Sequence, residues 1–257
     1  MLSEGTFDGR VAIVTGGGSG IGRAIGIELA RLGASVGLVG RRSEVLDTAV
    51  VEIEEAGGSA MALAGDVRDR ERVEEAAAQL RHRFGSVDLL VNAAAGNFRV
   101  APEDMSPRAW DAVVRIVLDG TWLWTQAVGR AAIKDKRPAA ILNIGTVGAL
   151  QGGPATVHSA SAKAGVVAMT KSLAAAWGPH GVRVNLLTPG ITADTPGANI
   201  LWADEADRAR TTEDVPLRRA GTLDEVSNAA AYLLSDHASY ITGANLLIDG
   251  GRALGRP

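Results

Sequence analysis

Seven short apolar runs recur along the chain, and amphipathic segments separate most of them. The runs cover residues 10–16, 35–40, 59–65, 87–93, 139–145, 182–189 and 245–249. Each run is nearly continuous in its hydrophobicity, which is typical of strands covered on both faces. The segments 70–84 and 224–235 between such runs have helical patterns. Strands that alternate with helices predict an α/β fold with a doubly wound parallel sheet and helices on both faces.

The chain has 257 residues and shows no linker, repeat or low-complexity tract, so we expect one domain spanning 1–257. The net charge of −3 gives no reason to expect nucleic acid or an anionic membrane as a partner. No apolar run approaches the ~20 residues of a membrane span. With no targeting signal recognised, a cytoplasmic location is expected. Cysteine is absent and the four histidines lack metal-ligand spacing, so no metal site is expected.

Glycines cluster directly after the first predicted strand, in the stretch VTGGGSGIG. Such glycines let backbone N–H groups approach a pyrophosphate at the positive N-terminus of the next helix. A packed turn could use the same residues, but the position in a βαβ series favours a Rossmann-type dinucleotide site. The predicted contacts are Thr15, Gly16, Gly18, Ser19, Gly20, Ile21 and Gly22.

The end of the second predicted strand indicates which dinucleotide binds. An NAD site normally has an acidic residue there, whereas this chain has Arg41 and Arg42 after Gly40. A guanidinium can pair with the 2′-phosphate of NADP, which a carboxylate would repel. NADP(H) is therefore favoured, although both arginines could instead be solvated residues at a helix start.

Polar and small residues follow the third and fourth predicted strands. Asp66 and Val67 come after one strand, and Asn92, Ala93 and Ala94 end the other. We expect all five at the cofactor, with Asp66 near the adenine ring. Asp and Asn also favour turns in the absence of any ligand, so a purely structural role stays open for both.

Taken together with Lys163 and Pro189-Gly190, these motifs resemble the short-chain dehydrogenase/reductase family over the whole chain. The stretches NAAAGNF, SASAKAGV and SLAAAWGPHGVRVN resemble the 2,4-dienoyl-CoA reductases within that family. Those enzymes reduce conjugated unsaturated fatty acyl thioesters with NADPH. The pair Asn97-Phe98 is the most specific mark of this resemblance.

Two residues depart from the carbonyl reductases of the family. Ser159 stands where those enzymes have a tyrosine that transfers the proton, and Val117 stands where they have a relay asparagine. A serine hydroxyl is a far weaker acid than a phenol of pKa ~10, so Ser159 cannot replace it. The loss of both the tyrosine and the relay asparagine suggests a mechanism different from that of the carbonyl reductases.

The resemblance implies roles for four catalytic residues. Asn97 would donate to the thioester oxygen of a dienolate, unless it only caps its loop. Lys163 and Ser159 lie four residues apart on one helical face and would hold the nicotinamide ribose. Thr146 stands at the family's usual serine position. The second donors of the mitochondrial and peroxisomal types are missing, because Gly148 and Val117 occupy their positions.

The proton donor is therefore unassigned. The candidates are Thr146, a water held by Lys163, His158 and Asp119. The last two could equally be an ordinary helix-start residue and an ordinary loop residue.

A long segment after the sixth predicted strand, 191–216, is expected to form a substrate lid. Ile191 and Thr192 would then touch the nicotinamide, beside Pro189 and Gly190. Phe98, Leu201 and Trp202 are expected to contact the acyl chain, although Leu201 and Trp202 could simply pack on the core.

Three functions compete. The favoured one is an NADPH-dependent reductase of enoyl or dienoyl thioesters. The others are a ketone or alcohol oxidoreductase with an atypical proton donor, and a catalytically silent NADP(H)-binding protein. Family members pair helices corresponding to 108–133 and 157–178, usually as tetramers. Because Trp122 and Trp124 are large for one small domain to bury, we expect a homotetramer.

Overall fold

A computed structural model of the protein describes residues 2–195, 198 and 205–254. Its sheet contains seven strands in the order β3-β2-β1-β4-β5-β6-β7, and every neighbouring pair is parallel. The predicted doubly wound α/β fold is confirmed. The strands are β1 (Val11–Thr15), β2 (Ser35–Gly40), β3 (Ser59–Ala64), β4 (Leu89–Asn92), β5 (Ala139–Ile144), β6 (Val182–Pro189) and β7 (Asn245–Ile248).

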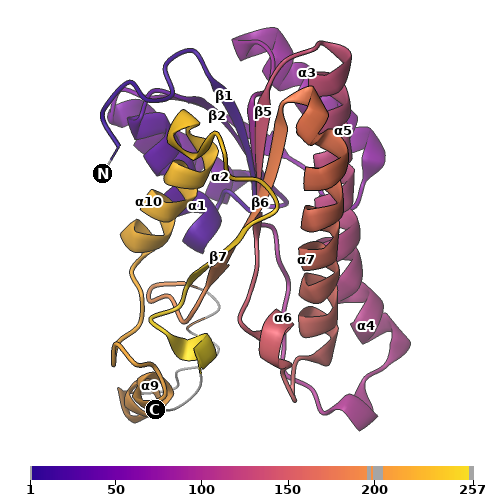
Figure 1. The fold of residues 1–257 in the computed structure, drawn as a ribbon, viewed down its shortest axis with the longest axis vertical. Coiled ribbons are helices and arrows are strands. Elements are labelled where there is room, and N and C mark those ends of the chain that lie inside the picture. The colour runs from indigo at the N-terminus through magenta and orange to yellow at the C-terminus, as the bar shows by residue number, and fades with distance from the viewer. Residues whose placement is uncertain (1, 196–197, 199–204, 255–257) are drawn as a thin grey trace.

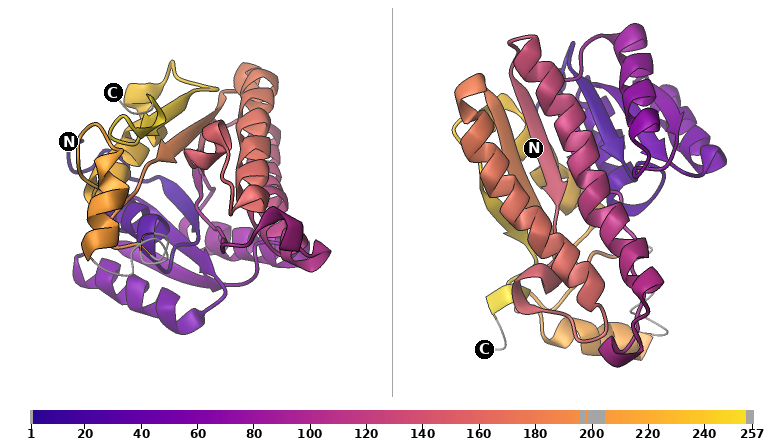
Figure 2. Two further views of the ribbon diagram at one scale, coloured as in Figure 1. Left: turned by 90° about the horizontal axis from the view of Figure 1, so that it is seen from below. Right: turned by 90° about the vertical axis from the view of Figure 1, so that its right-hand side faces the viewer.

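Helices cover both faces of this sheet (Figures 1 and 2). One face carries α1 (Gly20–Arg31), α2 (Ser43–Glu55) and α10 (Leu223–Leu234), and the other carries α3 (Arg70–Phe84), α5 (Gly120–Lys134) and α7 (Val157–Trp177). Two buried apolar clusters result, with Ile25 and Leu46 in the first and Leu80 and Trp124 in the second. This double cover explains why the inner strands β1, β4, β5 and β6 are apolar along nearly their whole length.

The remaining helices of the described residues are short. They are α4 (Pro107–Val114), α6 (Gly148–Gln151) and α9 (Glu205–Glu213), with 3₁₀ turns at Pro102–Asp104, Gly178–His180, Asp236–Ala238 and Arg252–Leu254. Among the residues that the structure describes, no helix has the length and apolar character needed to cross a membrane.

The segment 108–133, expected to be one helix, is interrupted. A π-helical turn (Arg115–Asp119) separates α4 from α5. Val117 in this turn is fully buried and packs with Ala162 and Val166 of α7. A π turn changes the helical register locally without breaking the apolar pattern, so the sequence periodicity could not reveal it.

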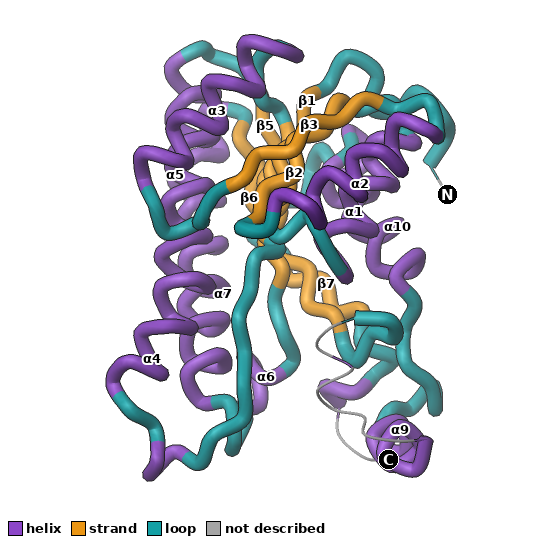
Figure 3. The backbone as a smooth tube through the Cα atoms, turned by 180° about the vertical axis from the view of Figure 1, so that it is seen from behind, coloured by secondary structure: helices purple, strands orange, loops and turns teal. Residues whose placement is uncertain are grey.

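The strand order places the site. Because all strands are parallel, their carboxyl ends meet at one edge of the sheet. β1 lies between β2 and β4, so the chain proceeds in opposite directions from this point and leaves a crevice at the strand ends. The chain leaves the sheet at this edge on its way to α4 and α6, as Figure 3 shows.

Candidate active site

The turn between β1 and α1 accepts only glycine at two positions. Gly16 has a φ of +69°, and a Cβ added there would lie 2.9 Å from the Ala93 carbonyl oxygen. A Cβ on Gly22 would lie 2.3 Å from the Gly16 carbonyl oxygen. Ser19, the residue before α1, makes no side-chain capping hydrogen bond. The first N–H groups of α1 therefore face an open cradle that suits a pyrophosphate.

Thr15 fixes the loop after β4 beside this cradle. Its hydroxyl oxygen accepts hydrogen bonds from the amides of Ala93 and Ala94, both at 3.2 Å, and the hydroxyl donates to the Val91 carbonyl at 3.4 Å. The side chain is buried, all of these partners are backbone atoms, and Thr15 is not among the residues that line the pocket at the carboxyl ends of β1, β2 and β3. Any part that Thr15 has in cofactor binding therefore acts through the backbone of this loop.

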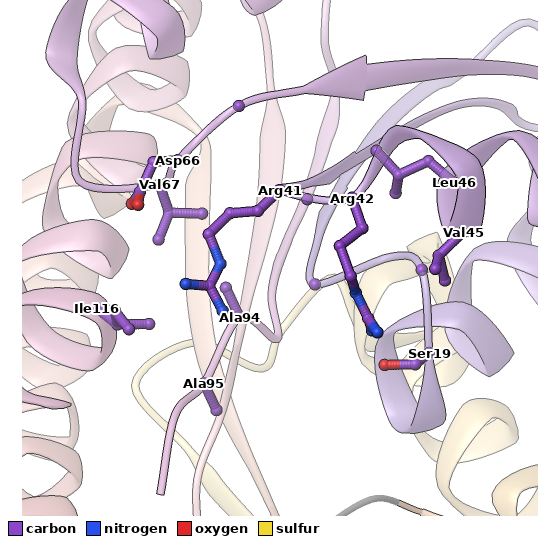
Figure 4. A pocket seen from close by; sticks show the side chains of 14 residues that line it. Ser19, Arg41, Arg42, Val45, Leu46, Asp66, Val67, Ala94, Ala95 and Ile116 are labelled. Atoms are coloured by element: carbon purple, nitrogen blue, oxygen red, sulfur yellow. The ribbon is translucent and has the colours of Figure 1, made fainter. Parts of the chain in front are cut away.

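A pocket opens at the carboxyl ends of β1, β2 and β3 (Figure 4). Its lining includes eight of the residues predicted to bind the cofactor, namely Gly16, Gly18, Ser19, Arg41, Arg42, Asp66, Val67 and Ala94. It also includes Gly40, Val45, Leu46, Gly65, Ala95 and Ile116, which sequence reasoning missed. Gly40 and Gly65 are the last residues of the predicted strands 35–40 and 59–65, and that position could have identified them.

Charged side chains enter this pocket from two strands. Arg41 extends from the end of β2 between Asp66 and Ala94, and Arg42 points toward Ser19 (Figure 4). Asp66 follows β3, and its carboxylate is held by Arg68 at 2.6 Å. The hydrogen bond from the Arg68 side chain, followed by smaller contributions that include Arg41, holds the pKa of the Asp66 carboxyl below its usual range.

Asn92 lies beneath the pocket. Its side-chain amide donates to Asn143 of β5 and to Thr125 of α5, both at 2.9 Å. Asn143 in turn donates to Thr170 of α7 at 2.9 Å. The four side chains are buried and join two strands to the two helices behind them. Asn92 therefore fixes the position of α7, the helix that carries Lys163 and Ser159.

Lys163 is buried, and its ammonium group donates to the carbonyl of Ile144 at the end of β5. Burial lowers the pKa of Lys163 to about 8. The neighbouring position on α4–α5 is apolar, because Val117 packs against Ala162 and Val166. Val117, which replaces the expected relay asparagine, thus packs against the neighbours of Lys163 on α7 and offers no polar group of its own.

An aromatic contact brings the loop after β4 onto the start of α7. The ring of Phe98 meets the ring of His158 edge to face, with centroids 4.5 Å apart and planes at 74°. Nearby, the Val100 amide donates to the Ala155 carbonyl at 3.0 Å. Since Asn97 precedes Phe98 and Ser159 follows His158, this contact brings the loop position of Asn97 close to the helix position of Ser159.

The Asn97 side chain is oriented by its own backbone. Its Oδ1 atom accepts a hydrogen bond from the Phe98 amide at 3.0 Å, which leaves the Nδ2 group to act as donor. The residue is exposed at the sheet edge. An exposed amide donor is the kind of group that can stabilise negative charge on a bound ligand.

The candidate proton donors differ in exposure. His158 is fully buried under Phe98, and neither ring nitrogen has a hydrogen-bond partner within the described residues. Thr146 is half-buried after β5, and Asp119 is exposed at the end of the π turn.

The residues after β6 lie at the same edge. The Gly190 amide donates to the Ile248 carbonyl at 2.9 Å, and Thr192 pairs with Gly221. Ile191 and Thr192 are buried. Pro189, Gly190, Ile191 and Thr192 do not line the pocket at the first three strands, and neither do Lys163, Gly20, Ile21, Gly22 and Ala93.

The predicted lid, 191–216, lies partly outside the described residues, and Leu201 and Trp202 are among those left out. Its described portion includes α9. Across 2–195, 198 and 205–254, no three histidine or acidic side chains gather as a metal site would require.

Comparison with known proteins places these features in context. A family model described as enoyl-(acyl carrier protein) reductase matches residues 16–253. A protein of Bacillus subtilis named "Probable 2,4-dienoyl-CoA reductase [(2E)-enoyl-CoA-producing]" is 41% identical over 246 residues, which are 95% of this chain and 97% of that protein.

Solved structures agree with this comparison. A short chain dehydrogenase from Bacillus anthracis superposes with a TM-score of 0.90 and 40% identity, covering 96% of this chain and 97% of the other. A gluconate 5-dehydrogenase from Burkholderia cenocepacia, in complex with NADP and tartrate, has a TM-score of 0.90 and 31% identity, covering 96% of each chain.

Proposed function

Since the chain belongs to the short-chain dehydrogenase/reductase family, we propose that this oxidoreductase uses NADPH to reduce a conjugated carbon–carbon double bond of an acyl-CoA thioester. The observation that carries the proposal is the pairing of a donor amide at Asn97 with the loss of the tyrosine at Ser159. Relatives named as 2,4-dienoyl-CoA reductases support the substrate class.

Reduction of a carbonyl group requires a proton for the alkoxide that forms. Ser159 is buried and is a weak acid, and the apolar cluster around Val117 offers no relay to Lys163. Both features argue against carbonyl chemistry. Reduction of a dienoyl thioester has a different main requirement, because charge collects on the thioester oxygen before any carbon is protonated.

Asn97 meets that requirement in the proposed reaction. Its Nδ2 group would donate to the thioester oxygen, and the bond between its Oδ1 atom and the Phe98 amide keeps the donor oriented. Phe98 and the lid segment 191–216 would contact the acyl chain. Lys163 and Ser159 would hold the nicotinamide ribose, with Thr146 beside them, and Pro189, Gly190, Ile191 and Thr192 would approach the nicotinamide ring.

The pocket at β1, β2 and β3 fits the adenosine end of the cofactor. Gly16 and Gly22 allow the close backbone packing of this turn, because a Cβ at either position would meet backbone atoms, and the N-terminus of α1 that follows would hold the pyrophosphate. Arg41 and Arg42 enter the pocket where an NAD site would have a carboxylate. When bound there, NADPH would supply the hydride for the far end of the conjugated system.

The test follows NADPH absorbance with three substrates in parallel: a trans,trans-2,4-dienoyl-CoA, a trans-2-enoyl-CoA and a 3-ketoacyl-CoA. We expect oxidation of NADPH with the dienoyl substrate and none with the ketoacyl substrate. Faster turnover of the ketoacyl substrate would restore the carbonyl-reductase interpretation. No turnover of any substrate, with NADPH still bound, would favour the silent binding protein.

A further inference from the structure

Asp66 places a negative charge in the pocket that is proposed to receive a phosphate. Asp66 is one of the residues that line the pocket, and its side chain is 29% exposed. A carboxylate at this place would repel the 2′-phosphate of NADP and would also attract any arginine meant for that phosphate. Neutralisation of Asp66 would therefore favour NADP in this pocket.

Arg68 supplies the neutralising charge from outside the pocket. Its Nε atom donates to Oδ1 of Asp66 at 2.9 Å, and its Nη2 atom donates to Oδ2 at 2.6 Å. The Arg68 amide also donates to Oδ1, at 3.0 Å. Arg68 is not among the residues that line the pocket. A bidentate pair of this kind fixes both the charge and the orientation of the carboxylate.

Arg41 is the side chain that would otherwise pair with Asp66. It lies close enough to contribute to the low pKa of the Asp66 carboxyl, after the larger effect of the Arg68 hydrogen bond. In Figure 4 the Arg41 side chain extends into the pocket on the side of Asp66, while Arg42 turns toward Ser19. Each arginine thus has a different neighbour.

We propose that Arg68 determines the cofactor preference indirectly, by occupying the Asp66 carboxylate so that Arg41 stays available for the 2′-phosphate. This inference rests on the NADPH preference within the proposed function. Arg68 is here a positioning residue that acts through Asp66. Oδ1 already accepts two hydrogen bonds, but Oδ2 accepts only one and keeps a lone pair, so Asp66 can still accept a hydrogen bond from an adenine amino group.

A purely structural role for the same pair makes a different prediction. The Asp69 amide donates to the Asp66 carbonyl at 3.1 Å, and Asp69 then caps α3, so Arg68 could simply stabilise this turn. Loss of the pair would then lower the melting temperature and weaken NADPH and NADH alike. The ratio of the two dissociation constants separates the two roles, because the cofactors differ only in the 2′-phosphate.

The experiment measures dissociation constants of NADPH and NADH by nicotinamide fluorescence, at low ionic strength and without an acyl substrate. The variants are Arg68→Ala, Asp66→Asn and the double variant. Arg70→Ala serves as the control, because it also removes one positive charge and lies only two residues from Arg68. The Arg70 side chain is exposed and contacts Gln126. Melting temperatures are recorded for all four.

We expect Arg68→Ala to reduce the preference for NADPH over NADH roughly three- to fivefold, the upper part of the range for a partly exposed ion pair. The double variant should return the preference to within about twofold of the unaltered protein, because no carboxylate then competes for Arg41. Asp66→Asn alone and Arg70→Ala should keep the preference.

Three results would overturn the inference. The first is an unchanged preference in Arg68→Ala. The second is a preference that stays low in the double variant, since Arg68 would then contact the phosphate itself. The third is equal binding of both cofactors by the unaltered protein, which would remove the proposed NADPH preference as well. If the protein fails to reduce dienoyl-CoA but still prefers NADPH, the proposed reaction is wrong and the inference about Arg68 is unaffected.

Discussion

Asn97 is the residue on which the proposed chemistry depends most. Because its amide would act where charge is greatest, Asn97→Ala should lower the turnover number roughly 10²–10³-fold with little change in NADPH affinity. Ser159→Ala should cost far less, since the serine transfers no proton. Steady-state rates on a dienoyl-CoA, combined with cofactor titrations, give the comparison. If Ser159→Ala is the more damaging change, the serine takes part in proton transfer and Asn97 does not have the main role.

Arg41 and Arg42 are the residues proposed to select NADPH. The double change to alanine should remove most of the preference for NADPH over NADH, because each charge-assisted hydrogen bond contributes about 1.5–3 kcal/mol. Titration of both cofactors against both proteins measures the effect. A double variant that keeps the full preference would contradict the assignment of these arginines to the 2′-phosphate.

Lys163 links the site to stability. Its pKa of about 8 in the folded protein lies below the ordinary value of 10.5, so between these pH values the unfolded chain holds a proton that the folded chain has released. The free energy of unfolding attributable to Lys163 therefore rises with pH across this window, and the penalty for burying the charge is fully present below pH 8. That penalty is on the order of 3 kcal/mol.

Urea unfolding of the protein and of Lys163→Met, at pH 7 and pH 9.5, tests this linkage. The methionine variant should be the more stable protein at pH 7, and its advantage should shrink at pH 9.5. An advantage that does not change with pH would mean that the buried ammonium carries no such penalty.

At the scale of elements, the turn between β1 and α1 has no tolerance for a side chain at Gly22. The 2.3 Å approach of an added Cβ to the Gly16 carbonyl means that Gly22→Ala must shift α1 away from β1. We expect a stability loss of about 1–3 kcal/mol and loss of NADPH binding. Gly178→Ala is the matched control, since a Cβ there meets nothing within 4 Å, and it should change neither property. Equal behaviour of the two variants in melting and titration would contradict the packing argument.

The strands could be predicted closely because each is a short apolar run with a sharp end. The first, expected at 10–16, is Val11–Thr15. The π turn could not be predicted, since it leaves the apolar pattern of 108–133 intact. For the site, sequence position located Thr15 and Asn92 at strand ends. Sequence position could not give the direction of their side chains. Both side chains form hydrogen bonds within the protein, Asn92 with Thr125 and Thr15 with the Ala93 amide.

For the whole molecule, we expect a homotetramer. The tryptophans give this prediction less support than their size suggested, because Trp124 is only 1% exposed within its own chain. The edge strand β7 supports the prediction better, because its apolar side chains Leu246 and Leu247 are 38% and 39% exposed. Light scattering at micromolar concentration should yield four times the chain mass of 26.5 kDa. A monomer mass would contradict the prediction.

The central place of β1 has a consequence for synthesis on the ribosome. The strand emerges first, yet it needs β4 as well as β2 for its neighbours. From Gly40 to Asn92 the nascent chain must grow by 52 residues, which takes roughly 3–10 seconds at ordinary elongation rates. During that interval one hydrogen-bonding edge of β1 has no native partner, although its five side chains are all destined for the interior. Chaperones that shield apolar strand edges would therefore matter most for the first ninety or so residues of this chain, before the second half is made.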